Sequence, residues 1–139
     1  MLLAILTACR GDKVLLVKVC PQLACGVTLT VQLKGTVPNE YRLDAVTPDG
    51  IELSAHWKNG YGVYPEGYFS QKRRAEVFGS HVNYYDFTPE EVKLNLSWEG
   101  GQVGGTVQPV YRIVFPNGEG CPPECRFGEV VLDLEQSNK

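Results

Sequence analysis

The sequence predicts an all-β protein, built as an antiparallel sandwich or barrel, on three observations. Apolar and polar residues alternate with a period of two in several short segments, as in strands with one buried face. Turn-forming residues are frequent, with 15 glycines and 9 prolines among 139 residues. No segment carries the apolar spacing of an amphipathic helix. A chain of this length forms one domain, which we place at residues 13–134, followed by a frayed tail at 135–139.

The clearest strands are those with unbroken alternation. Within residues 27–34 the odd positions are apolar, and within residues 92–98 the even positions are apolar. Two further apolar rows lie at 41–45 and 51–57, separated by the Thr-Pro-Asp-Gly sequence at 47–50. Because proline, aspartate and glycine favour tight turns, these two rows are predicted to form a hairpin.

The remaining strands have weaker patterns. We expect an opening strand at 13–19, weaker strands at 75–79 and 82–87, an inward row of Val107, Tyr111, Ile113 and Phe115, and a closing row of Val130, Leu132 and Leu134. Thr88 and Glu91 have the spacing of a capping box, which predicts a brief helical turn between strands. The total is about seven to nine short strands.

Charge and motifs exclude several classes of function. The chain has 13 Lys and Arg against 16 Asp and Glu, a net charge of −3, which provides no broad positive field for a phosphate backbone. We therefore expect no nucleic-acid partner. The sequence contains no phosphate-binding loop, calcium loop or His-Glu-x-x-His motif, and we expect no cofactor and no metal.

The N-terminus predicts export. Residues 2–8 are apolar apart from Thr7 and lead directly into Cys9, a stretch too short to cross a bilayer, which requires about 20 apolar residues. It fits the end of a secretory signal sequence. We interpret residues 1–12 as a truncated signal peptide, lipid-attachment site and tether, with Cys9 as the lipidated residue. The competing interpretation is a buried strand at 2–8, with Cys9 as an ordinary core thiol.

The other four cysteines form an even set. Lipidation of Cys9 would leave Cys20, Cys25, Cys121 and Cys125, which an exported chain can oxidise to two disulfides. Four cysteines allow three pairings, and the short spacings favour two local rings within 20–25 and 121–125. A four-cysteine zinc site is the alternative, although neither pair has the two-residue gap common in such sites.

Two resemblances sharpen this interpretation. The sequence Leu-Thr-Ala-Cys at 6–9 resembles the lipobox of bacterial lipoproteins, in which the cysteine receives a diacylglyceryl group. The turn-and-strand motifs at 35–41, 87–92 and 111–126 resemble those of small bacterial surface lipoproteins with an immunoglobulin-like or carboxypeptidase-regulatory-like sandwich. The resemblance implies an immunoglobulin-like fold and a periplasmic or cell-surface location, and it brings no site residues with it.

Catalysis is not expected. His56 shares a predicted outward strand face with Glu52 and Ser54, a set that has the residue types of a hydrolytic triad. Same-face neighbours on one strand lie about 7 Å apart, however, and nothing nearby orients a nucleophile. A solvated strand face is the preferred interpretation, and a hydrolytic enzyme is the alternative.

The most distinctive segment is 58–74, which is rich in tyrosine and glycine. Tyrosine supplies wide contact area in binding loops at low entropic cost, and glycine supplies an adaptable backbone. The candidate ligand-binding residues are Tyr61, Tyr64, Tyr68, Phe69, Arg73 and Arg74. The preferred interpretation is nevertheless structural: a loop that folds over the open end of the sandwich, with its aromatic residues half-buried.

Taken together, these features predict a non-catalytic, membrane-anchored protein of the cell envelope, acting as a structural or binding module. If it binds a ligand, we expect a carbohydrate or an envelope protein, held by the segment 58–74.

Overall fold

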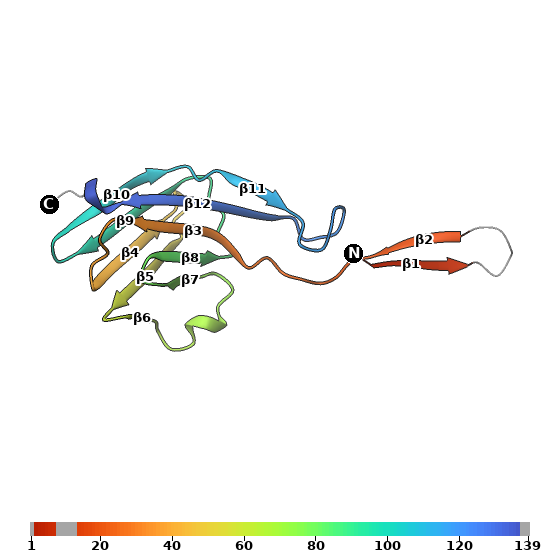
Figure 1. Ribbon diagram of the computed structural model, residues 1–139, viewed down its shortest axis with the longest axis horizontal. Helices are drawn as coiled ribbons and strands as arrows, with labels where there is room; N and C mark the ends of the chain where they lie inside the picture. Colours follow the sequence, from red (N-terminus) through yellow and green to blue (C-terminus); the bar gives the residue numbers. More distant parts are fainter. Residues whose placement is uncertain (1, 8–13, 137–139) are drawn as a thin grey trace. The chain divides into compact units, whose positions relative to one another are not determined.

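The computed structural model describes residues 2–7 and 14–136, and it is an all-β sandwich (Figure 1). Two five-stranded sheets pack face to face, and a separate two-stranded sheet lies near the N-terminus in sequence. Among the residues described, helix is limited to the short 3-10 turns η1 (Tyr68–Ser70) and η2 (Leu134–Gln136). The predicted fold class is therefore confirmed at the level of an all-β sandwich.

The first sheet holds the predicted hairpin at its centre. In spatial order its strands are β10 (Gly101–Val107), β9 (Val92–Trp98), β4 (Glu40–Val46), β5 (Glu52–Lys58) and β6 (Tyr61–Val63). All neighbouring strands are antiparallel. The hairpin turns through Thr47 and Gly50, whose N–H donates to the Thr47 carbonyl at 3.0 Å, and the positive φ of Gly50 suits glycine.

The second sheet contains one parallel pair. In spatial order its strands are β11 (Tyr111–Val114), β12 (Cys125–Asp133), β3 (Val27–Lys34), β8 (His81–Tyr85) and β7 (Arg74–Val77). The last strand, β12, runs parallel to β3, with Val130 opposite Val31. This parallel pair is a local departure from the expected antiparallel pairing, because the chain returns to β3 through distant residues and not through a hairpin.

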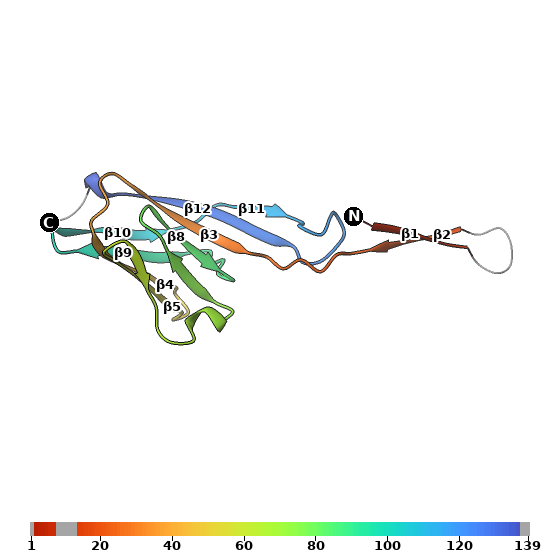
Figure 2. The ribbon, with the colours of Figure 1, turned by 60° about the horizontal axis from the view of Figure 1, so that its bottom comes forward.

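The two sheets face each other (Figure 2). The buried core residues come from both sheets, and their burial follows the sequence alternation. Leu29 and Val31 of β3, Leu43 of β4 and Leu94 and Leu96 of β9 are fully buried. Burial of such aliphatic side chains contributes about 1.5–3 kcal/mol each, which makes this cluster the main source of stability.

Three details differ from the predicted pattern. The strand count is higher than predicted, because three-residue β6 and glycine-rich β10 show little alternation. The predicted inward row at 107–115 ends early, since Ile113 and Phe115 are exposed. The capping-box segment at 88–91 forms bends and no helical turn.

The chain divides into two compact units. One comprises residues 1–25 and 113–125, and the other comprises 26–112 and 126–139. The single sandwich domain expected at 13–134 stays a prediction. The 3-10 turn η2 includes Glu135 and Gln136, the first two residues of the expected frayed tail, and residues 137–139 lie outside the described residues.

The first unit contains the N-terminal hairpin. Strand β1 (Leu2–Thr7) pairs antiparallel with β2 (Val14–Val19). The strand at 2–7 agrees with that part of the competing interpretation, whereas the lipidation residue Cys9 and the tether that follows it lie outside the described residues. None of the helices in the described part of the chain has the length and apolar character that crossing a bilayer requires.

Two disulfides connect the two chain segments of this unit. They join Cys20 to Cys121 and Cys25 to Cys125, with Cα–Cα distances of 5.5 and 5.6 Å. The predicted local rings are wrong, because residues 20–26 adopt no turn that would bring the ends of that segment together. The zinc alternative is also wrong, since all four thiols are consumed. Disulfides of this kind indicate an oxidising, extracytoplasmic environment.

Candidate functional site

A polar surface covers the outer face of β4, β5 and β9. Alternation turns Leu43 and Ala55 into the core, so the residues between them face outward. Strand register then places Arg42 opposite His56 and Asp44 opposite Ser54. The hairpin thus brings four polar side chains from two strands onto one face.

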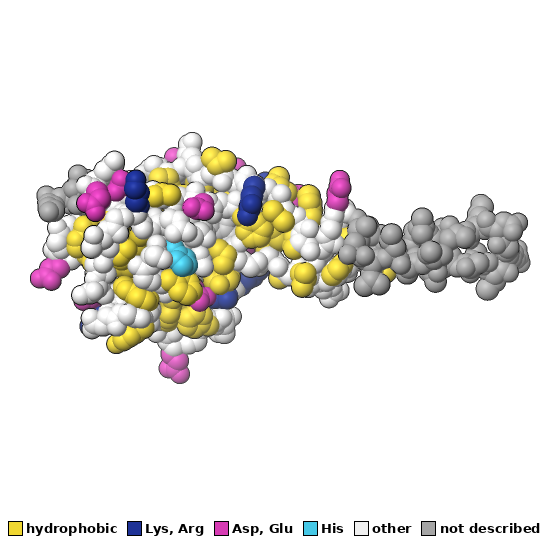
Figure 3. Space-filling view, viewed as in Figure 1, with side chains coloured by type: hydrophobic (Ala, Val, Ile, Leu, Met, Phe, Trp, Pro, Cys, Tyr) yellow, Lys and Arg dark blue, Asp and Glu magenta, His cyan; other side chains and the backbone are white. Residues whose placement is uncertain are grey.

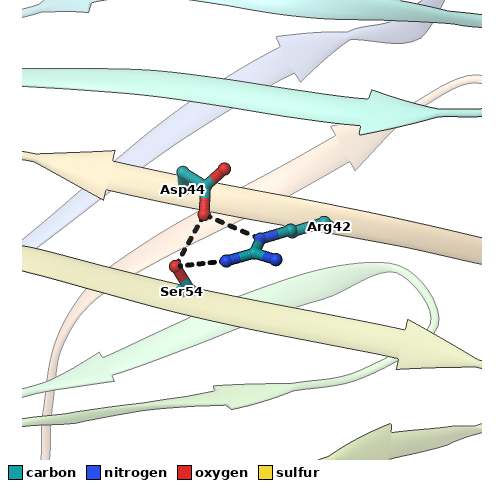
Figure 4. Close-up of polar contacts among 3 residues, drawn as sticks. All are labelled: Arg42, Asp44 and Ser54. Carbon is teal, nitrogen blue, oxygen red and sulfur yellow. Dashed lines mark hydrogen bonds and ion pairs between the residues drawn. The ribbon is translucent and has the colours of Figure 1, made fainter.

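Three of these side chains form a closed network (Figure 4). Ser54 Oγ donates to Asp44 Oδ1 at 2.6 Å, and Arg42 Nε donates to the same oxygen at 3.1 Å. Arg42 Nη2 also donates to Ser54 Oγ, at 3.4 Å. The guanidinium charge is therefore offset by a carboxylate, and the network holds the three groups in one arrangement without net charge.

His56 also has a carboxylate as its hydrogen-bond partner. Its Nε2 lies 3.0 Å from Glu40 Oε1, one strand away. Ser54 directs its hydroxyl hydrogen to Asp44 and not to His56, so the two residues do not form the nucleophile and base of a triad. The outward position predicted for His56 is confirmed, and its partner is a residue that sequence alone did not indicate.

Glu40, Arg42 and His56 border a shallow groove of about 580 Å³. Its lining combines Glu40, Arg42 and His56 with Ser97 and Trp98. Asn39, Asn59 and Glu99 complete the polar rim. A groove lined by oriented planar polar groups and an indole can hydrogen-bond to a hydroxyl-rich ligand and pack against its apolar face.

A second groove, of about 780 Å³, lies on the outer face of the other sheet. Arg112, Glu129 and Phe127 line it. Within the described residues, no hydrogen bond or ion pair joins Arg112 to Glu129. These two charged side chains do not fix one another, so an occupant that uses them would bear the cost of ordering them. We therefore regard the smaller groove as the better candidate.

The tyrosines of the segment 58–74 have a structural role that the binding prediction missed. Tyr68 is buried, and its hydroxyl accepts the N–H of Ala75 at 2.6 Å. The Tyr64 hydroxyl accepts the N–H of Val77 and donates to its carbonyl. Ala75 and Val77 belong to the edge strand β7, so the two phenols cover backbone groups that face away from the sheet.

Of the other candidate residues in this segment, two aromatic side chains are exposed and two arginines contact neighbouring residues. Tyr61 and Phe69 are exposed, and Phe69 contacts the Tyr64 ring edge-on at 4.6 Å. Arg73 donates to the Asp86 carbonyl, and Arg74 stacks over the Tyr85 ring. Of the six predicted binding residues, Tyr61 and Phe69 thus retain an exposed aromatic surface.

Acidic and basic side chains are interspersed on the visible face of the sandwich (Figure 3). Within the described residues, no group of three or more His, Cys, Asp or Glu side chains is arranged to hold a metal ion.

Sequence patterns alone do not mark Glu40, Arg42, Asp44 or Trp98 as site residues. One signal was available for two of them: the predicted hairpin implies that Arg42 and Asp44 face outward beside Ser54 and His56. Comparison with protein-family models, curated proteins and solved structures finds no match for this chain.

Proposed function

We propose that this protein is a non-catalytic binding module of a cell envelope, anchored to a membrane through lipid at Cys9. The disulfide-stabilised unit, which requires an oxidising compartment, supports this location. An immunoglobulin-like lipoprotein of the bacterial surface is the class that the sequence motifs favour.

The ligand that the groove favours is a neutral oligosaccharide. The observation that carries this proposal is the internal pairing of the polar groups: Arg42 forms an ion pair with Asp44, and His56 hydrogen-bonds to Glu40. Paired groups retain free hydrogen-bonding positions but do not strongly select an ion. Trp98 adds an aromatic surface for the apolar face of a sugar ring.

Titration calorimetry with soluble cellohexaose and chitohexaose tests this assignment. Arg42→Ala is expected to weaken binding by about tenfold or more, because it removes donors and frees Asp44. Lys93→Ala is the matched control, since Lys93 is an exposed cation on β9 that does not line the groove. Equal losses in the two variants, or no binding of any oligosaccharide, would reject the assignment.

Anchoring has a separate test. Metabolic labelling with palmitate should mark the natural chain and should be lost in Cys9→Ser, because the thiol carries the lipid. Label retained in Cys9→Ser would contradict anchoring at this residue and would leave the groove proposal untouched.

A protein ligand is the second candidate, and the exposed aromatic surface of Tyr61 and Phe69 favours it. Tyr61→Ala should then reduce retention of an envelope protein. The hydrolytic alternative predicts an activity that His56→Ala abolishes.

A further inference from the structure

The two sheets present four free edges, and three of them are protected. The edge of β7 is covered by the Tyr64 and Tyr68 hydroxyls, and β6 is only three residues long. The edge strand β11 has four residues, includes Arg112 and lies between Pro109 and Pro116 in the sequence. Short length, charge, proline and coverage all discourage pairing with another chain.

The fourth edge, β10, has none of these devices. It is seven residues long, with the sequence Gly-Gln-Val-Gly-Gly-Thr-Val, and carries neither charge nor proline. Gln102, Gly104, Gly105 and Thr106 are exposed. Its main contact beyond β9 is the short η2, and no hydrogen bond joins its outer edge to another described segment. Such an edge is a template for strand addition.

The sequence of β10 is also complementary to itself. Val103 and Val107 pack against the core, so the odd positions face inward and the even positions face outward. An antiparallel pair centred on Gly104 would place each valine opposite a glycine and Gln102 opposite Thr106. Large side chains would therefore meet small ones, polar would meet polar, and no like charges would be brought together.

We propose that two copies of this chain associate through antiparallel pairing of β10, about a two-fold axis at Gly104. Such an interface uses the same residues of both copies, as a two-fold dimer requires. The ten strands of the two joined sheets would form one continuous sheet. The groove bordered by Arg42 and His56 would then lie on the same face of that sheet in both copies.

The proposed interface is small, so the expected dimer is weak and depends on concentration. Sedimentation equilibrium of the full-length Cys9→Ser chain, which excludes lipid and a disulfide at that position, provides the test. Between about 10 μM and about 1 mM, the mean mass should rise from 15.4 kDa toward twice that value.

Two double variants test the interface itself. Q102K/T106K would place lysines opposite each other in both symmetry-related pairs and should weaken association by about tenfold or more. Q102K/T106E would place lysine opposite glutamate at the same two points and should retain association. Thermal unfolding of both variants checks that each is folded, and Q102E/T106E replaces the lysine variant if that variant is not.

Loss of association in the like-charged variant together with retention in the oppositely charged variant would support the proposal. A Cys9→Ser chain that stays monomeric at about 1 mM, or association unaffected by like charges at 102 and 106, would overturn it. Neither outcome depends on whether the groove binds carbohydrate.

Discussion

The side-chain amide of Asn117 hydrogen-bonds to both backbone groups of Leu23. The Leu23 N–H donates to Asn117 Oδ1 at 2.9 Å, and Asn117 Nδ2 donates to the Leu23 carbonyl at 2.9 Å. A second Nδ2 hydrogen bond reaches the Pro122 carbonyl at 2.7 Å. A buried asparagine therefore links the segment at 20–25 to the loop that carries Cys121, and it supplements the disulfides.

Asn117→Ala should lower the free energy of unfolding by about 2 kcal/mol, because three hydrogen bonds are lost inside a disulfide-bonded unit. Asn117→Asp should cost more, since a carboxylate oxygen would then face the Leu23 and Pro122 carbonyls. Urea denaturation measures both. An Asn117→Asp variant as stable as the natural chain would refute this role.

The disulfides should contribute to stability non-additively. Either bridge closes a loop of about 100 residues and is worth about 4.7 kcal/mol in the chain-entropy model, whereas the second then closes a loop of about ten residues and adds about 3. Replacing one cysteine pair by serine should cost about 3 kcal/mol, and replacing both should cost about 8. Non-reducing peptide mapping checks the pairing, and a peptide linking Cys20 to Cys25 would disprove it.

Tyr68→Phe should destabilise the sandwich by about 1–3 kcal/mol, because it leaves the N–H of buried Ala75 without an acceptor. Tyr61→Phe is the matched control, since Tyr61 is exposed, and it should have an effect below about 0.5 kcal/mol. Amide exchange at Ala75 should accelerate only in Tyr68→Phe. Equal stability of the two variants would count against the edge-covering role.

Tyr84→Phe should change the free energy of unfolding in the opposite direction to Tyr68→Phe. The Tyr84 hydroxyl is buried and has no hydrogen-bond partner among the described residues, so its removal relieves a desolvation cost. We expect a stability equal to that of the natural chain or higher by about 1 kcal/mol. A loss above that size in thermal unfolding would mean that this hydroxyl has a partner in solution.

Stability should fall in alkali. Burial raises the pKa of Tyr111 from 10.0 to about 12, and burial also raises the pKa of Tyr41 and Tyr84. Each phenol favours the folded state fully below pH 10, and for Tyr111 this contribution is lost as the pH rises from about 10 to about 12. The difference in phenolate absorbance at about 295 nm between the natural chain and Tyr111→Phe should place the ionisation of Tyr111 near pH 12. An ionisation of Tyr111 near pH 10 would contradict the burial.

The alternation of apolar and polar residues predicts which side chains form the core, but it does not predict the contacts made at the ends of the strands. Tyr41, Leu43 and Ala45 are buried as their period requires, because strand geometry alone fixes which face they occupy. Thr28 is buried although its position suggests exposure, since a bulge in β3 turns it inward, where its hydroxyl bonds to Phe87. Such a bulge depends on pairing with β8, which no local pattern reports.

Long-range pairing also explains the other differences. The disulfides follow the parallel alignment of the chain around β3 and β12, and spacing within either cysteine pair contains no information about that alignment. In the same way, composition marks Tyr64 and Tyr68 as binding residues, and only the position of β7 reveals their backbone partners.

The indole signals of the two tryptophans test the proposed groove most directly. Both tryptophans pack against the core, but Trp98 also lines the groove, whereas Trp57 lies against Gly79 and does not line it. In a proton–nitrogen correlation spectrum titrated with cellohexaose or chitohexaose, the Trp98 indole signal and the amides of Arg42 and His56 should shift while Trp57 stays unchanged. Shifts confined to Tyr61 and Phe69, or a spectrum unaltered by both sugars, would contradict the account.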